Sequence, residues 1–505
     1  MKRSKFSLSN YKVLSCDGGY LVPVGLEEVL PGDVFQHRVR GLIRAAPMIV
    51  PVMHQVDARL HTWFVPFRLI WPEFEDFITG GPDGEDATVP PTIALTYTNP
   101  TTGTNIIGQL PDYLGVPPGL ALTVSALPFR AYNLIWNLNY RDQDLQTARA
   151  LSTASGVDAT TAVDLARICW EKDNYTSARL EAQKGAALQL PLGDQAPIVG
   201  LGLYGDTSTH DIQNQAVRET DGGTPTYPFA QPTNTAARIA IQQTDGGATA
   251  SPMVYADLSA ATGVDAITLR EFFALQRFQE ARSRYGSEYV DYLRFLGVRP
   301  EDARLQRPEY LGGGKVPMQF SEVLQTAPNE GDESFTGSLA GHGIAGARAN
   351  RYRRFFSEHG FVITLLSIRP RTMYVDGLRR LWSRTTREQF YQRELEHIGQ
   401  QEILNKEIKA GHASPNGTFG YSDRYYEYRG TENTVAGEMR DTLNYWHMAR
   451  EFSGDPALNS AFVTCTPTDR VFAGSAELID QYYCMIHHSL QARRMLSKKS
   501  GSFIY

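Results

Sequence analysis

The stretch Val34-Phe-Gln-His-Arg-Val-Arg-Gly-Leu-Ile-Arg44 alternates between two sets of side chains along its whole length. One face carries Phe35, His37, Val39, Gly41 and Ile43, and the other carries Gln36, Arg38, Arg40 and Arg44. Successive side chains of a β-strand point to opposite faces, so this period of two predicts a long, half-buried strand.

Other stretches predict further strands at both ends of the chain. Residues 56–64 alternate in the same way before Pro66 interrupts the pattern. The apolar run at 361–368 is typical of a strand buried on both faces, and we predict strands at 461–466 and 482–490 as well. With 44 glycines and 28 prolines indicating many turns, the chain is predicted to be mainly β, with long loop insertions that contain helices.

Helices are expected to be the minor component. Thr268-Leu-Arg-Glu271 is a capping-box pattern that predicts a helix start, with a break near Gly286, and a second helix is predicted from Thr386 onward. Acidic residues after Trp71-Pro72 indicate a third helix start. The run Leu311-Gly-Gly-Gly-Lys-Val316 lacks the spacing of a phosphate-binding loop and is predicted to be a flexible turn.

The segment between Leu190 and Gly263 (residues 190–263) differs in composition from the rest of the chain. It is rich in Gly, Thr, Ala, Gln and Asp, with turn signals and little periodicity. We interpret it as a surface insertion, and a disordered linker is the alternative. Strands at both ends with an insertion-rich middle make a jelly roll with elaborated loops a candidate topology.

Charge and cysteine usage exclude some classes of protein. Residues 1–70 carry a balance of +4, residues 71–268 of −13 and residues 269–505 of +3, within a total of −6. This polarity suggests two surfaces with different partners, one of them a polyanion.

No apolar segment follows the basic N-terminus, so no export signal or membrane role is predicted. The four scattered cysteines are predicted to be reduced, buried thiols.

Several segments resemble the major capsid protein of the Microviridae, of the gokushovirus type. They occur in the same order over nearly the whole chain and include Phe6-Ser-Leu-Ser-Asn-Tyr-Lys12, Leu30-Pro-Gly-Asp-Val-Phe-Gln-His37, Leu127-Pro-Phe-Arg-Ala-Tyr-Asn-Leu-Ile-Trp136, Tyr289-Val-Asp-Tyr-Leu-Arg-Phe-Leu-Gly-Val-Arg-Pro300, Arg304-Leu-Gln-Arg-Pro-Glu-Tyr-Leu-Gly-Gly-Gly-Lys315 and Asp441-Thr-Leu-Asn-Tyr-Trp-His-Met-Ala-Arg450. The similarity is weakest at residues 190–263.

That resemblance implies one capsid domain over residues 1–505, an eight-stranded viral jelly roll built from both ends of the chain. It further implies sixty copies in a T=1 icosahedral shell around circular single-stranded DNA. The insertion would form a protrusion near the three-fold axes and contact a bacterial surface receptor. Implied partners are a scaffolding protein, a small DNA-binding packaging protein and a minor pilot protein, with assembly in the host bacterial cytoplasm.

Two groups of basic residues are candidates for contact with the genome. Residues 348–387 contain ten arginines and two acids, interleaved with aromatic rings, and both chain ends are basic. Arginine suits phosphate, and aromatic faces stack on unpaired bases. The candidates are Lys2, Arg3, Lys5, Arg351, Arg353, Arg354, Arg493, Arg494, Lys498 and Lys499. Intersubunit ion pairs and solvated tails remain the alternatives.

No motif in the sequence predicts catalysis, a cofactor or a metal site, since the histidines lack a nucleophile or acid partner at diagnostic spacing. A self-assembling shell subunit is therefore the favoured function. The competing interpretations are a carbohydrate-binding or hydrolytic β-sandwich and a free protein that binds single-stranded DNA.

Overall fold

The computed structural model divides the chain into two compact units. One comprises Met1–Ala182 with Tyr285–Tyr505, and the other is Gln183–Arg284. The described residues are 3–82, 85–95, 107–183, 198–199, 201–204, 216–217, 227–228, 238–241, 255–256, 266–285, 306–326, 337–474 and 480–497.

The larger unit is built around an antiparallel sheet that we call sheet I. Its central strand β4 (Val34–Ala45) pairs with β21 on one side and with β16 and β17 on the other. The remaining members are β1 (Ser4–Ser7), β2 (Asn10–Cys16), β15 (Gln319–Leu324), β16 (Leu339–Arg348), β17 (Tyr352–Phe355) and β21 (Tyr482–Arg494). The first strand β1 pairs with the last strand β21, and the predicted strands at 34–44 and 482–490 are confirmed.

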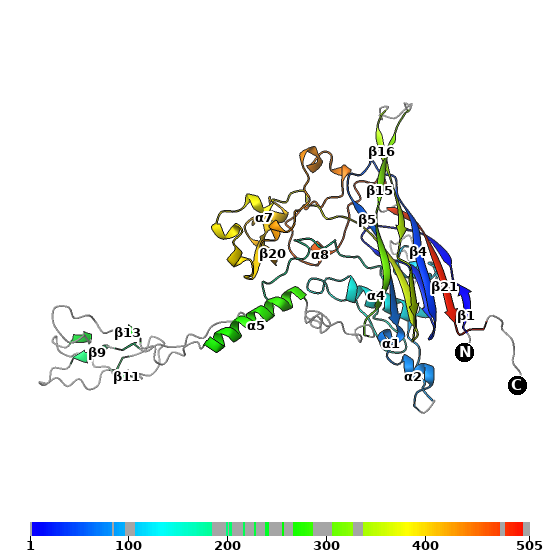
Figure 1. The fold of residues 1–505 in the computed structure, drawn as a ribbon, viewed down its shortest axis with the longest axis horizontal. Coiled ribbons are helices and arrows are strands. Elements are labelled where there is room, and N and C mark those ends of the chain that lie inside the picture. The colour runs from blue at the N-terminus through cyan, green and yellow to red at the C-terminus, as the bar shows by residue number, and fades with distance from the viewer. Residues whose placement is uncertain are drawn as a thin grey trace. The chain divides into compact units, whose positions relative to one another are not determined.

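A second antiparallel sheet, sheet II, packs against the first. Its strand order is β14-β5-β18-β3, and the strands are β3 (Leu21–Val29), β5 (Val56–Pro66), β14 (Glu309–Pro317) and β18 (Gly360–Pro370). The predicted strands at 56–64 and 361–368 are confirmed in β5 and β18. A β-sandwich of mainly antiparallel strands results (Figure 1).

The core between the sheets is formed by the inward residues of both. Val39 and Ile43 of β4 meet Leu60 of β5 and Leu366 of β18 in one buried cluster. Alternate residues of β4 and β21 are buried while their neighbours are not, because each strand turns one side chain in two toward the opposite sheet.

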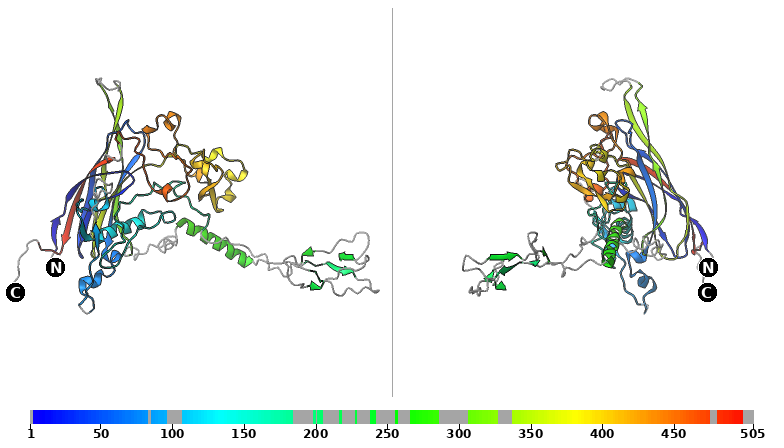
Figure 2. Two further views of the ribbon diagram at one scale, coloured as in Figure 1. Left: turned by 180° about the vertical axis from the view of Figure 1, so that it is seen from behind. Right: turned by 60° about the vertical axis from the view of Figure 1, so that its left-hand side comes forward.

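The outer face of sheet II is covered by helical and loop segments. Val65, Ile363 and Leu365 of this sheet join Phe129, Tyr132 and Ile135 of α4 (Leu127–Asn139) in a second buried cluster. Figures 1 and 2 show α4 on the side of the sandwich away from β4 and β21. Sheet II is therefore buried on both faces, which explains the continuous apolar run of β18.

The remaining elements are short apart from one helix. The helices are α1 (Phe67–Ile70), α2 (Phe74–Thr79), α3 (Leu110–Leu114), α5 (Ala266–Tyr285), α7 (Asn405–Ile408) and α8 (Ser460–Val463). The other strands are β6 (Thr92–Leu95), β7 (Leu122–Ser125), β8 (Ile198–Val199), β9 (Leu201–Tyr204), β10 (Ala216–Val217), β11 (Tyr227–Pro228), β12 (Arg238–Ile241), β13 (Tyr255–Ala256), β19 (Gln400–Leu404) and β20 (Thr418–Asp423). Most of the predicted insertion at 190–263 lies outside the described residues.

Two of the predicted helices are confirmed, and one predicted helix and one predicted strand are not. The helix predicted near Thr268 is α5, which begins at Ala266 and ends at Tyr285. The acidic helix start after Pro72 is confirmed by Glu75 and Asp76 in the first turn of α2. The helix predicted from Thr386 onward is wrong, because only the 3-10 turns Arg387–Gln389 and Arg393–Leu395 form there. The strand predicted at 461–466 is also wrong, since α8 begins at Ser460.

The glycine-rich run at 311–316 is part of β14 and not the predicted turn. Its glycines serve close packing: a Cβ on Gly314 would lie 1.9 Å from the carbonyl oxygen of Arg348, and one on Gly313 would lie 2.3 Å from that of Leu60. Three backbones approach each other here at distances that exclude a side chain.

The four cysteines are all buried with free thiols, as predicted for their burial. No helix among the described residues has the length and apolar character needed to cross a lipid bilayer.

Candidate nucleic-acid interface

The outer face of sheet I is an ordered array of cations. The strand registers place outward side chains in six rows across the sheet. The first three rows are Lys5, Arg493, Val34 and Phe355; then Ser7, Gln491, Gln36 and Arg353; then Ser489 and Arg38. The fourth to sixth rows are Tyr11, His487, Arg40 and Arg348; then Val13, Met485, Leu42 and Gly346; then Ser15, Tyr483, Arg44 and Ile344. Rows are about 7 Å apart and neighbouring strands about 5 Å.

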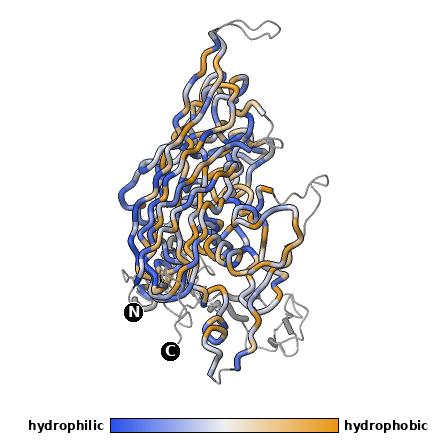
Figure 3. The backbone as a smooth tube through the Cα atoms, turned by 90° about the vertical axis from the view of Figure 1, so that its right-hand side faces the viewer, coloured by the Kyte–Doolittle hydropathy of each residue, from blue (hydrophilic) through white to orange (hydrophobic). Residues whose placement is uncertain are grey.

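We call the outward surface of these six rows the basic face. Its cations are Lys5, Arg38, Arg40, Arg44, Arg348, Arg353 and Arg493, and none of its row positions holds an acidic residue. Figure 3 views the sandwich from this side, where hydrophilic and apolar residues alternate along the strands.

The cations of the basic face lack acidic partners in the described part of the chain. Among the residues that the structure describes, no carboxylate lies within ion-pair distance of any of the seven. The pKa of Arg38 is lowered, first by slight desolvation and then by repulsion from neighbouring guanidinium groups. Those groups belong to Arg348, Arg40 and Arg351. Clustered charge of one sign, open to solvent, creates a site for a polyanion.

Several of the residues predicted from the sequence lie on or beside this face. Lys5 faces Arg493 across the β1–β21 pair, and Arg353 faces Gln36 of β4. Arg351 is exposed between β16 and β17. The Arg3 guanidinium lies 5.1 Å from the ring centroid of Phe355, an outward residue of the first row.

Two predicted residues are directed elsewhere. Arg354 pairs with Glu309 of β14 at 3.1 Å, and Arg494 pairs with the buried carboxylate of Asp33 at 3.0 Å. Because adjacent residues of a strand point to opposite faces, each has its side chain on the side opposite to that of its neighbour Arg353 or Arg493. Lys2, Lys498 and Lys499 lie outside the described residues.

Sequence reasoning did not assign Arg38, Arg40 and Arg44 to the site, and it included Arg348 only as a member of the arginine-rich segment 348–387. The alternation of residues 34–44 contained the signal for the first three, since it grouped them on one strand face. What it lacked was the partner strand, because β21 lies more than 400 residues away in the chain.

Beneath the basic face, a chain of hydrogen bonds connects the two sheets. His488 Nε2 lies 3.1 Å from the carbonyl oxygen of Val24, which can only accept. His488 Nδ1 must then accept from His37 Nε2, also at 3.1 Å, and His37 Nδ1 accepts from the Tyr352 hydroxyl at 3.1 Å. Burial and the proximity of His488 lower the pKa of His37 to about 3, and burial lowers that of His488 to about 4. Both rings are therefore neutral at pH 7.

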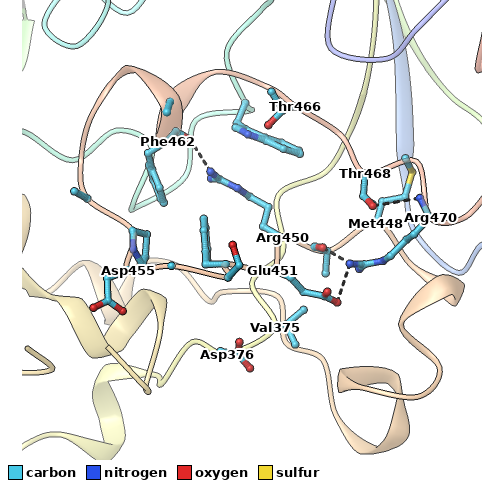
Figure 4. Close-up of a pocket in the computed structure, with 18 of the residues that line it drawn as sticks. Val375, Asp376, Met448, Arg450, Glu451, Asp455, Phe462, Thr466, Thr468 and Arg470 are labelled. Carbon is cyan, nitrogen blue, oxygen red and sulfur yellow. Dashed lines mark hydrogen bonds and ion pairs between the residues drawn. The ribbon is translucent and has the colours of Figure 1, made fainter. Parts of the chain in front are cut away.

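A pocket of about 840 Å³ lies in the other part of this unit (Figure 4). Its most central cation is Arg450, which lies 4.3 Å from the ring centroid of Phe462 and 5.0 Å from that of Trp170. Arg450 also donates to the carbonyl of Phe462 at 2.7 Å, and Arg470 pairs with Glu451 at 2.8 Å. These groups bind one another.

Comparison with known proteins gives consistent results over the whole chain. A family model described as "Capsid protein (F protein)" matches residues 1–503. The protein named Capsid protein VP1 of Bdellovibrio phage phiMH2K is 35% identical over 93% of this chain and 89% of its own length. Proteins of the same name from Chlamydia phage 1 and Spiroplasma virus 4 are 32% and 29% identical, over 94% and 91% of this chain and 91% and 87% of their own.

Proposed function

Since the chain belongs to the phage capsid protein (F protein) family, we propose that sixty copies close a T=1 icosahedral shell around circular single-stranded DNA, with the basic face turned inward. The family role is structural and non-enzymatic: the chain is a major capsid protein, assembles with copies of itself and is a component of the virion. A hydrolytic β-sandwich is thereby excluded.

The strand order supports an eight-stranded jelly roll as the finer description of the sandwich. Along the chain, β2, β3, β4 and β5 alternate between sheets I and II, β14 stays in sheet II, and β16, β18 and β21 alternate again. The two sheets then read β2-β21-β4-β16 and β3-β18-β5-β14, two four-stranded layers with Greek-key connections. In this description β1, β15 and β17 extend or supplement sheet I.

The single observation that carries the genome contact is the set of unpaired cations on the basic face. A cation that lacks an acidic partner neutralises phosphate without first breaking an ion pair, and its counterions are released to solution on binding. The proposed contacts are Arg3, Lys5, Arg351, Arg353 and Arg493 from the sequence, together with Arg38, Arg40, Arg44 and Arg348. Arg354 and Arg494 are left out because acids already bind them.

Other parts of the proposal rest on the resemblance to gokushoviruses. The insertion at 190–263 would form a protrusion near the three-fold axes and contact a bacterial surface receptor. A scaffolding protein, a small DNA-binding packaging protein and a minor pilot protein would take part, and assembly would occur in the host bacterial cytoplasm.

Two measurements test the shell and its content. Sixty copies of the 56.2-kDa chain would have a mass of about 3.4 MDa in native mass measurement, and a particle of another copy number would overturn the T=1 assignment.

For the genome contact, the full chain is titrated with circular single-stranded DNA at several salt concentrations. Arg38→Gln/Arg40→Gln should reduce the slope of log K against log salt by about 1.4, since each lost phosphate contact removes about 0.7.

A matched control removes the same charge elsewhere. Arg387 and Arg393 are exposed and belong to 3-10 turns outside the two sheets, so Arg387→Gln/Arg393→Gln should leave the slope unchanged. An unchanged slope in the first variant, or an equal change in both, would contradict an inward-facing basic face.

A further inference from the structure

The basic face is interrupted by a strip of exposed apolar and aromatic side chains. Tyr11 is 72% exposed and Val13 is 71% exposed on β2, while Met485 and Tyr483 on β21 are 48% and 41% exposed. Leu42 of β4 completes the fifth row beside Met485. We call these five residues the apolar strip.

Register places the strip between cations. In the fourth row Tyr11 is followed across the sheet by His487, Arg40 and Arg348, and in the sixth row Tyr483 is followed by Arg44. The strip spans about 14 Å along the strands, two row intervals, with arginines at both ends. Among the described residues, neither tyrosine ring makes a ring contact with another aromatic side chain or lies beneath a cation.

A contiguous group of exposed apolar side chains on a sheet face is a candidate interaction site. A polyanion without apolar surface, such as a duplex seen from its backbone, would fill the arginine rows and leave the strip in water. A single strand offers both phosphates and unpaired bases, and any base can stack on an aromatic or apolar side chain. The occupant that matches both the apolar strip and the arginines of the adjoining rows is therefore a single strand of DNA.

We propose that the apolar strip is a base-stacking platform: unpaired bases of the genome lie on Tyr11, Met485 and Tyr483 while the adjoining phosphates contact Arg40, Arg348 and Arg44. This inference rests on the proposed genome contact of the basic face and extends it from a charge interaction to selection of single strands. It requires no sequence preference, because stacking uses the π-face that every base has.

The test compares two probes with the full chain: an oligothymidylate and an abasic oligonucleotide of the same length. The wild type should bind the oligothymidylate more tightly. Tyr11→Ala/Tyr483→Ala should reduce that affinity on the order of tenfold per base lost and leave the affinity for the abasic strand unchanged. Tyr11→Phe/Tyr483→Phe is the matched control and should behave as wild type, because the rings remain.

The outcomes separate this inference from the proposed function. If the abasic strand binds as tightly as the oligothymidylate, or if the alanine variant binds both normally, the platform is overturned while the basic face stands. If the alanine variant binds both probes normally but no longer assembles, the strip is covered by another copy of the chain and the platform is again overturned. If neither probe binds the wild type, the genome contact itself fails.

Discussion

The outer faces of the two sheets differ in how their charges are satisfied. On sheet II, Arg59 of β5 pairs with Glu171 at 2.6 Å and Lys315 of β14 pairs with Asp57 at 2.7 Å. On sheet I, seven cations occupy the same kind of outward strand position with no acidic partner among the described residues. Helix α4 and its flanking loops cover one face, and no described helix or strand covers the other (Figures 1 and 2).

The proposed function accounts for this difference in physical terms. A cation that neighbouring segments partly cover loses some hydration, and an acidic partner within the chain compensates for that loss. A cation on an open face keeps its hydration and stays available for a partner that arrives later. Under the proposed function, the paired cations of sheet II stabilise the fold, and the cations of sheet I form the surface that binds DNA.

The largest loss of stability is expected from a substitution in the layer that covers sheet II. Arg130 of α4 and Asp158 form an ion pair at 2.8 Å with no exposed side-chain surface. Burial alone would raise the pKa of Asp158, but hydrogen bonds from Thr161, Thr160 and Arg130 lower it to about 2. Asp158→Asn leaves the buried guanidinium uncompensated and should cost about 3–5 kcal/mol in urea unfolding. Asp164→Asn, at a pair whose carboxylate is 68% exposed, is the control and should cost no more than about 1 kcal/mol.

A second test concerns pH and the histidine pair between the sheets. The folded pKa values of His37 and His488, about 3 and about 4, lie below the unfolded value of about 6.5. The unfolded chain therefore binds more protons below pH 6.5, so stability should fall as the pH falls toward 4.5, by about 3 kcal/mol for each ring. Lys12, His487 and Tyr352 are the neighbouring titratable groups.

The measurement is the free energy of unfolding at pH 7.5, 6.5, 5.5 and 4.5. No further gain in stability is expected from this pair above pH 7. A profile that is flat between pH 6.5 and 4.5 would contradict the neutral hydrogen-bonded chain from Tyr352 to Val24.

A smaller loss of stability is expected from breaking an ion pair at a partly exposed position of sheet II. Arg59→Gln removes the partner of Glu171, whose pKa the basic neighbours Arg59, Lys315 and Arg369 lower despite burial. The loss should be about 1 kcal/mol in the same unfolding assay, because both side chains retain some solvent contact. A neutral result would mean that Lys315 alone satisfies Glu171.

The smallest effect on stability is expected on the basic face. Arg40→Gln removes an exposed side chain that has no acidic partner among the described residues, and it should change the free energy of unfolding by less than about 0.5 kcal/mol. Its effect should appear instead in binding to single-stranded DNA. A stability loss equal to that of Arg59→Gln would remove the distinction between the two faces.

Local patterns in the sequence predicted the strands well where burial followed a simple period. Residues 34–44 and 482–490 alternate because one side of each strand faces the core, and both are strands. The helix predicted from Thr386 onward was wrong. Tyr391, Leu395 and Ile398 fall at helical spacing, yet Tyr391 and Ile398 are exposed and only short turns occur. A periodic pattern without a surface to pack against does not support a helix.

The sequence by itself determined the family, the predominance of β-strands and the presence of basic residues near both ends and in residues 348–387. Only the tertiary structure decided which of those cations lie together on one surface. Arg40, Arg348 and His487 lie in one row because β4 pairs with β16 and β21, strands separated by hundreds of residues. Side-chain direction follows from local alternation, but which strands are neighbours depends on the packing of the whole core, and no short segment contains that information.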